Sequence, residues 1–132
     1  EARRRLAYVS PDLPLPEALT VAEYLAFLAD ARRQPRDAAR HAADPFDLNP
    51  GLLLCRLTRD QRQRARLAGA AATGSRVILL HDPGHGLDDD AGRMLIEWVL
   101  HASGLGAAVV LAGVNALADL PVRAIAWGKA VA

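Results

Sequence analysis

Residues 57–64 read LTRDQRQR, residues 76–83 read RVILLHDP, and residues 86–88 read GLD. The first segment opens a run of helix-forming residues that ends near Thr73-Gly74-Ser75. The second contains an uninterrupted apolar run at residues 77–80, which is typical of a strand buried on both faces of a parallel sheet. A helix, a buried strand and a glycine-containing turn in this order predict an α/β fold.

Further helices and strands are predicted on both sides of this region. Before it, we expect a strand at residues 5–9, a helix opened by a Thr20–Glu23 capping box, and a short helix at about residues 36–43. After it, residues 91–101 have the spacing of an amphipathic helix, and residues 107–111 and 122–127 are apolar, strand-like runs. The alternation predicts one α/β domain over residues 1–132, with a parallel sheet and a helical insert at about residues 12–56.

Composition narrows the classes of protein that fit. The chain has 132 residues, 52% of them hydrophobic, which is enough for one domain with a core. A net charge of +1 gives no indication of nucleic-acid binding. No run of about 18 uncharged apolar residues is present, so we expect no direct membrane insertion. Cys55 is the only cysteine, and its apolar neighbours predict a buried side chain rather than a nucleophile.

Taken in order, these segments resemble the ABC-type ATPases, the nucleotide-binding domains of ABC transporters. LTRDQRQR resembles the signature motif of that family, RVILLHDP its Walker B strand, and GLD its D-loop. Residues 4–9 (RRLAYV) resemble the strand before the Q-loop, residues 19–25 (LTVAEYL) the start of the helical subdomain, and residues 119–131 the closing strand. The resemblance covers nearly the whole chain and implies a P-loop NTPase-like parallel sheet with a helical insert, truncated at the N-terminus.

At the positions that contact nucleotide in the family, most residues of this chain differ. Pro11 stands where the Q-loop glutamine is expected, and Thr58, Arg59 and Asp60 replace the serine and two glycines of the signature motif. Thr58 can supply a hydroxyl in place of serine. The side chains of Arg59 and Asp60 obstruct close backbone approach, and the Asp60 charge is expected to repel phosphate.

The Walker B positions differ too. His81 replaces the aspartate that orients Mg²⁺ in the family, and imidazole is a poor ligand for this hard cation. Asp82 replaces the catalytic glutamate and is one methylene shorter, and a misplacement of about 1 Å can cost about a hundredfold in rate. Residues 112–115 (AGVN) stand where the switch histidine is expected. Gln61 and Asp88 keep the family residues, as remnants of a nucleotide site.

The phosphate-binding loop GxxxxGK[ST] is missing from the sequence. Lys129, the only lysine, follows Gly128, but Arg123 occupies the position of the first glycine. In the family this loop comes before the strand at residues 5–9, so it would precede Glu1. We therefore expect no cofactor and no ATP hydrolysis by this chain alone, and interpret it as a pseudo-ATPase with a degenerate Walker B motif.

The resemblance also implies protein partners. In the family the helical insert docks on a membrane protein and the nucleotide domains pair head to tail. An inactive member is thus expected to act as an adaptor or structural subunit in the cytoplasm, associated with the membrane through its partner. The partner would be a membrane-protein complex, an active ABC ATPase or, in a homodimer, a second copy; nucleic acid is not expected. Leu13, Leu15, Tyr24 and Phe27 either form this contact or make up the insert's own small core.

A missing P-loop strand would leave a gap in the family's sheet. We expect the strand at residues 122–127 to shift into this gap, or another chain to supply a strand, because unpaired strand edges favour association.

Two other functions remain open. The chain is alternatively the C-terminal part of an ATP-binding ABC transporter subunit whose P-loop lies on a preceding segment. The second alternative is a metal-binding hydrolase, because residues 81–90 (HDPGHGLDDD) are rich in metal-ligating side chains. The aspartates at residues 88–90 have another explanation than a metal site, because negative charges are stabilised at the N-terminus of the following helix.

Charged residues recur along the helix predicted after residue 59. Asp60 and Arg64 lie at i, i+4, a pairing worth a few tenths of a kcal/mol on an exposed helix. Arg59, Arg62 and Arg66 share one side at i, i+3 and i+7. That side is either a phosphate- or RNA-binding surface or a solvated helix face, and the absence of interleaved aromatic residues favours the solvated face.

Overall fold

The computed structural model describes residues 6–113 of the 132-residue chain. Three parallel strands form a sheet in the order β1-β2-β3: β1 (Leu6–Val9), β2 (Val77–His81) and β3 (Ala108–Ala112). The helices are α1 (Val21–Ala31), α2 (Ala38–Ala43), α3 (Arg59–Ala72) and α4 (Asp89–Gly104), with short 3₁₀ helices η2 (Asp44–Phe46) and η3 (Leu54–Arg56). The expected strand at residues 122–127, the expected filling of a sheet gap, and Arg123, Trp127 and Lys129 lie outside the described residues.

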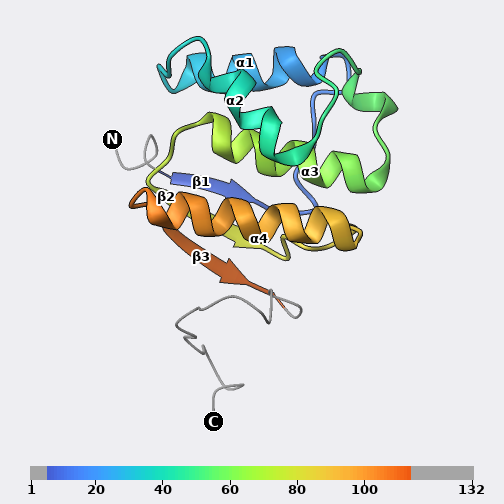
Figure 1. Cartoon of the computed structure of the whole chain (residues 1–132). Coiled ribbons are helices and arrows are strands. Elements are labelled where there is room, and N and C mark those ends of the chain that lie inside the picture. The colour runs from blue at the N-terminus through green and yellow to red at the C-terminus, as the bar shows by residue number, and fades with distance from the viewer. Residues whose placement is uncertain (1–5, 114–132) are drawn as a thin grey trace.

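The predicted α/β architecture with a parallel sheet is confirmed for residues 6–113. Leu6 pairs with Val77, and Val77 pairs in turn with Ala108. Parallel neighbours need long crossover connections. The insert together with α3 provides the connection from β1 to β2, and α4 provides the one from β2 to β3. In Figure 1, α1 and α2 form a layer beyond α3, on the side of α3 away from the sheet.

Polar side chains define where three of the helices begin. Thr20 accepts a hydrogen bond from the backbone N–H of Glu23 at 3.2 Å, which confirms half of the predicted capping box at the start of α1. Glu23 Oε1 accepts from the Thr20 hydroxyl at 3.0 Å rather than from the Thr20 backbone N–H. At the start of α3, the Thr58 hydroxyl accepts from the Gln61 N–H at 3.2 Å, while Gln61 Oε1 accepts from the Thr58 N–H at 2.9 Å. The Asp88 carboxylate caps α4 by accepting from the Ala91 N–H at 2.8 Å.

The two faces of the sheet differ in burial. The side chains of Ala7, Val9, Ile78 and Leu80 are buried and point toward α3 and α4. Since side chains alternate along a strand, Leu6, Tyr8 and Val110 lie on the opposite face, where they are exposed. This second group, with the half-buried Val77 and Leu79 between them in the register, is called the open sheet face below.

Aromatic packing joins the insert to α4. Phe46 in η2 is fully buried and meets Trp98 of α4 edge to face, with 5.5 Å between the ring centroids. Trp98 is therefore part of the core. The prediction that Cys55 is buried is wrong, because η3 turns Leu54 into the core and leaves the neighbouring cysteine exposed.

The two phenylalanines offer a matched test of this packing. Phe46→Ala removes a fully buried ring and is expected to lower the free energy of unfolding by about 3–5 kcal/mol. Phe27→Ala truncates a ring that is 65% exposed on α1 and should change it by less than about 0.5 kcal/mol. Urea denaturation followed by far-UV circular dichroism measures both values. Equal losses in the two variants would contradict the described core.

Candidate functional site

The carboxyl ends of the three strands lie along one edge of the sheet, as do the N-termini of α3 and α4. This edge is where ligands bind in open α/β sheets. It brings together the segments singled out by their sequence: residues 10–12 after β1, residues 81–88 after β2, Gly113 after β3, and residues 58–61 at the start of α3. Side-chain contacts join these segments. Buried Gln63, for example, donates a hydrogen bond to the Pro83 carbonyl at 3.1 Å.

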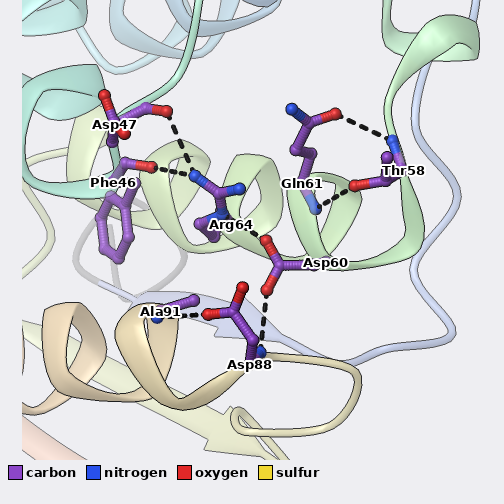
Figure 2. A network of polar contacts seen from close by, with 8 residues as sticks. All are labelled: Phe46, Asp47, Thr58, Asp60, Gln61, Arg64, Asp88 and Ala91. Carbon is purple, nitrogen blue, oxygen red and sulfur yellow. Dashed lines mark hydrogen bonds and ion pairs between the residues drawn. The ribbon is translucent and has the colours of Figure 1, made fainter.

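Asp60 sits at the centre of a polar network at this edge (Figure 2). One of its carboxylate oxygens accepts from Arg64 Nε at 2.6 Å, and the other accepts from the Asp88 N–H at 3.0 Å. Arg64 Nη1 in turn donates to the carbonyl oxygens of Phe46 and Asp47, at 2.9 and 3.1 Å. The network therefore connects the insert, α3 and the start of α4.

The predicted Asp60–Arg64 pair is confirmed, but its surroundings are not those of an exposed helix. The Asp60 and Arg64 side chains are only 18% and 14% exposed. Both charged groups hold further hydrogen bonds, to Asp88 and to the insert, so the contact is tertiary as well as local. Arg64 compensates the Asp60 charge, and this pairing weakens the repulsion of phosphate that was expected from the sequence.

Three residues that the sequence analysis interpreted as remnants of a nucleotide site make hydrogen bonds to the protein's own backbone: Thr58, Gln61 and Asp88. The Thr58 and Gln61 side chains satisfy backbone N–H groups at the start of α3, and the Asp88 carboxylate satisfies one at the start of α4. These side chains therefore perform capping, a structural task that needs no ligand.

At the end of β2, His81 and Asp82 lie side by side. His81 Nε2 is 3.4 Å from Asp82 Oδ2, and both side chains are partly exposed. The Asp82 N–H donates to the Ala112 carbonyl at 2.8 Å, and Asp82 has a φ of +44°, in the left-handed region. Gly113 has a φ of +122°, and a Cβ there would overlap the Asp82 carboxylate. Asp82 is thus tightly packed against the chain that follows β3.

A pocket of about 320 Å³ opens beside this network, between residues 11–12 and the first turns of α3. Its lining consists of Pro11, Asp12, Arg59, Arg62, Gln63, Arg66 and His85, and it is called the arginine pocket below. Arg62 and Arg66 are half-buried and bond to carbonyl oxygens of the insert, at Leu54 and Leu13. The interpretation of this side of the helix as a solvated face is therefore wrong for these two arginines.

The metal-ligating residue types at positions 81–90 are dispersed rather than gathered. His85 Nε2 lies 2.6 Å from Arg59 Nη2, and Asp90 pairs with Arg93, so both point to other partners. Over residues 6–113, no group of three His, Cys, Asp or Glu side chains is placed to hold a metal ion.

The four hydrophobic residues suggested as a partner contact occupy different environments. Leu15 is buried in the core, and Leu13 is half-buried. Tyr24 lies against α3, where a Cβ on Gly69 would come within 2.7 Å of its hydroxyl, and burial raises the pKa of Tyr24 while the nearby Arg66 charge opposes that rise. Phe27 is exposed and is available to a partner. None of the described helices is long and apolar enough to cross a membrane.

Comparison with known proteins identifies the fold. No protein-family model and no curated protein sequence matches this chain. Among solved structures, it matches an ABC transporter ATP-binding protein from Pyrococcus furiosus (17% identity, TM-score 0.75, covering 89% of this chain and 60% of that one). It also matches the ATP-binding cassette MJ0796, solved as a dimer with ADP and phosphate (21%, TM-score 0.78, 86% and 54%). A third match is CbiO1 of Clostridium perfringens, part of the transporter complex CbiONQ (22%, TM-score 0.70, 86% and 48%).

These similarities establish the class of fold. The chain has the P-loop NTPase-like fold of ABC transporter ATP-binding domains, as its motifs predicted. It spans about half to three-fifths of the length of these proteins, so the likeness in fold extends over part of such a domain. At identities of 17–22%, the likeness extends to the fold and leaves the activity to be argued from this chain's own residues.

Sequence reasoning missed two contacts at this edge. It found the Asp60–Arg64 spacing but not the bonds from Arg64 to the insert, since their acceptors are backbone carbonyls 17 and 18 residues away. It also left Gln63 unassigned. A signal was available there, because Gln63 is a polar residue on the apolar side of the helix, where it shares the inward face with Leu67 and Ala70.

The charge network can be tested with a matched pair of substitutions. Asp60→Asn removes the negative charge beside the mostly buried Arg64 guanidinium and is expected to lower the free energy of unfolding by about 1–3 kcal/mol. Asp90→Asn breaks the exposed Asp90–Arg93 pair and should cost less than about 1 kcal/mol. Urea denaturation at 0.1 M and 1 M NaCl gives both values. A loss at Asp60 no larger than that at Asp90, or one abolished by salt, would show that the network contributes little.

Proposed function

We propose that this chain is an ABC-type ATPase-like domain that does not hydrolyse ATP by itself and acts as an adaptor or structural subunit through protein–protein contacts. The observation that carries the proposal is the bonding of Asp60 to Arg64 and to the Asp88 N–H. The signature motif that this segment resembles has a glycine at the position of Asp60, and the backbone of that glycine contacts phosphate. Here it carries a side chain that ties the fold together.

The chemistry available at the end of β2 supports the same proposal. ATP hydrolysis needs a carboxylate to hold Mg²⁺ and a base or polar group to position the attacking water. His81 offers imidazole in place of the first group, and the Asp82 carboxylate is packed against Gly113. Pro11, on the first turn after β1, offers no side-chain donor or acceptor.

Exposed apolar side chains in residues 6–113 support the proposal of a protein partner. Parallel sheets are normally covered on both faces, whereas Leu6, Tyr8 and Val110 of the open sheet face are exposed. Phe27 adds an exposed ring on the insert. Because MJ0796 was solved as a dimer and CbiO1 is part of a transporter complex, we propose as partner a membrane-protein complex, an active ABC ATPase or a second copy of this chain. The domain would then work in the cytoplasm, held at the membrane through that partner.

One observation favours a second candidate function. The chain spans only 48–60% of the length of the three structures described above. A preceding segment that carried a P-loop could cover the open sheet face and bring a nucleotide to the carboxyl edge. In that case the chain is the C-terminal part of an ATP-binding ABC transporter subunit, and Asp82 is its candidate for the catalytic carboxylate.

Phosphate release from Mg-ATP distinguishes the two candidates. The chain alone is expected to release no phosphate above the buffer rate, because its described residues supply neither the P-loop nor a well-placed Mg²⁺ ligand. The double variant His81→Asp/Asp82→Glu, which restores the family's Walker B residues, serves as the matched comparison. Turnover by the unaltered chain that Asp82→Asn abolishes would overturn the adaptor proposal and support the second candidate.

A further inference from the structure

Three cationic side chains line the arginine pocket, which has a volume of about 320 Å³. This volume lies at the small end of ligand pockets, which run to about 300–1,000 Å³. Arg59, Arg62 and Arg66 come from successive turns of α3, and residues 11–12 after β1 close the opposite side. Side chains from two distant parts of the chain therefore enclose the space.

Arg62 uses both terminal guanidinium nitrogens in intramolecular contacts within residues 6–113, whereas Arg66 uses only one of its two. Arg62 donates Nη1 to the Leu54 carbonyl and Nη2 to Glu17, at 3.1 Å each. Arg66 donates Nε to the Leu13 carbonyl at 2.7 Å and Nη1 to Gln63 at 3.4 Å. Within residues 6–113, its Nη2 has no hydrogen-bond acceptor.

Arg59 has no carboxylate partner in the described part of the chain. Its Nη2 lies 2.6 Å from His85 Nε2, a nitrogen that must accept the hydrogen bond and is therefore unprotonated in this contact. Its Nε and Nη1 donors make no hydrogen bond to residues 6–113. Because Arg59 is exposed at the mouth of the pocket, these donors are open to an incoming anion.

Charge in and beside the pocket remains positive. The three arginines face two carboxylates, Asp12 in the lining and Glu17 paired with Arg62. Burial lowers the pKa of Arg66, and the like charge of Arg62 lowers it further, while Tyr24 and Asp12 act in the opposite direction. Crowded cations of this kind are stabilised by an added anion.

We propose that the arginine pocket binds a phosphate group, either free or carried by a small ligand, between Arg59 and Arg66. Guanidinium groups match the planar, multidentate donor geometry that phosphate oxygens accept. The site is formed by this chain's side chains, not by the glycine backbone of the family's signature motif. Phosphate binding at this site does not depend on ATP hydrolysis, so the proposed site can be tested independently of the proposed adaptor role.

Titration of the full chain with inorganic phosphate, followed by calorimetry and by ¹H–¹⁵N NMR, tests the site. Arg59→Gln should weaken binding about tenfold or more, because it removes charge-assisted hydrogen bonds. Asp12→Asn should strengthen it about two- to fivefold, because it removes an opposing charge whose carboxylate makes no hydrogen bond to residues 6–113. Arg93→Gln, which removes an exposed arginine outside the pocket, should leave the affinity unchanged.

A parallel titration with ATP without Mg²⁺ separates the two sources of phosphate. Binding of either ligand that Arg59→Gln weakens and Asp12→Asn strengthens supports the proposal. The proposal is overturned if neither ligand binds detectably, or if these variants do not change the binding. Circular dichroism of each variant verifies that the helices are retained, and Arg66→Gln provides a second loss-of-charge variant deeper in the pocket.

Discussion

The ion pair between Asp60 and Arg64 is the interaction on which the arrangement of the described structure depends most. Helix α3 lies between the insert and the sheet, and this pair attaches its first turns to both the insert and the start of α4. A largely buried charge is tolerated only when it is paired and hydrogen-bonded. The bonds to Asp88 and to the Phe46 and Asp47 carbonyls meet that requirement and set the orientation of α3 at the same time.

The same constraint explains why the carboxyl edge of the sheet is built from side chains that contact one another. Thr58 and Gln61 cap α3, Asp88 caps α4, and buried Gln63 holds the Pro83 carbonyl. Each satisfies a backbone group that would otherwise face solvent or the core without a partner. Residue types that resemble a nucleotide site thus have structural roles in this chain, and this is the physical basis of the adaptor proposal.

Two of the surfaces formed by residues 6–113 are suited to interaction with other molecules, and they differ in character. The open sheet face is apolar, as expected of a surface that packs against protein. The arginine pocket is small, polar and cationic, as expected of a site for a compact anion. They lie on different parts of the fold, one on the strands and one beside the first turns of α3, so binding at one does not require the other to be vacant.

Local patterns in the sequence determined the elements. The capping pair Thr20–Glu23, the apolar run at residues 77–80 and the i, i+4 spacing of Asp60 and Arg64 each predicted a feature that the structure contains, because caps, buried strands and helix pairs depend on residues close in the chain. Tertiary structure alone decided the exposure of Cys55, the burial of Leu15, the bonds from Arg64 to the insert, and the closure of the arginine pocket by residues 11–12. Each of these depends on segments brought together across many residues, whose separation and facing side chains are set by packing rather than by local spacing.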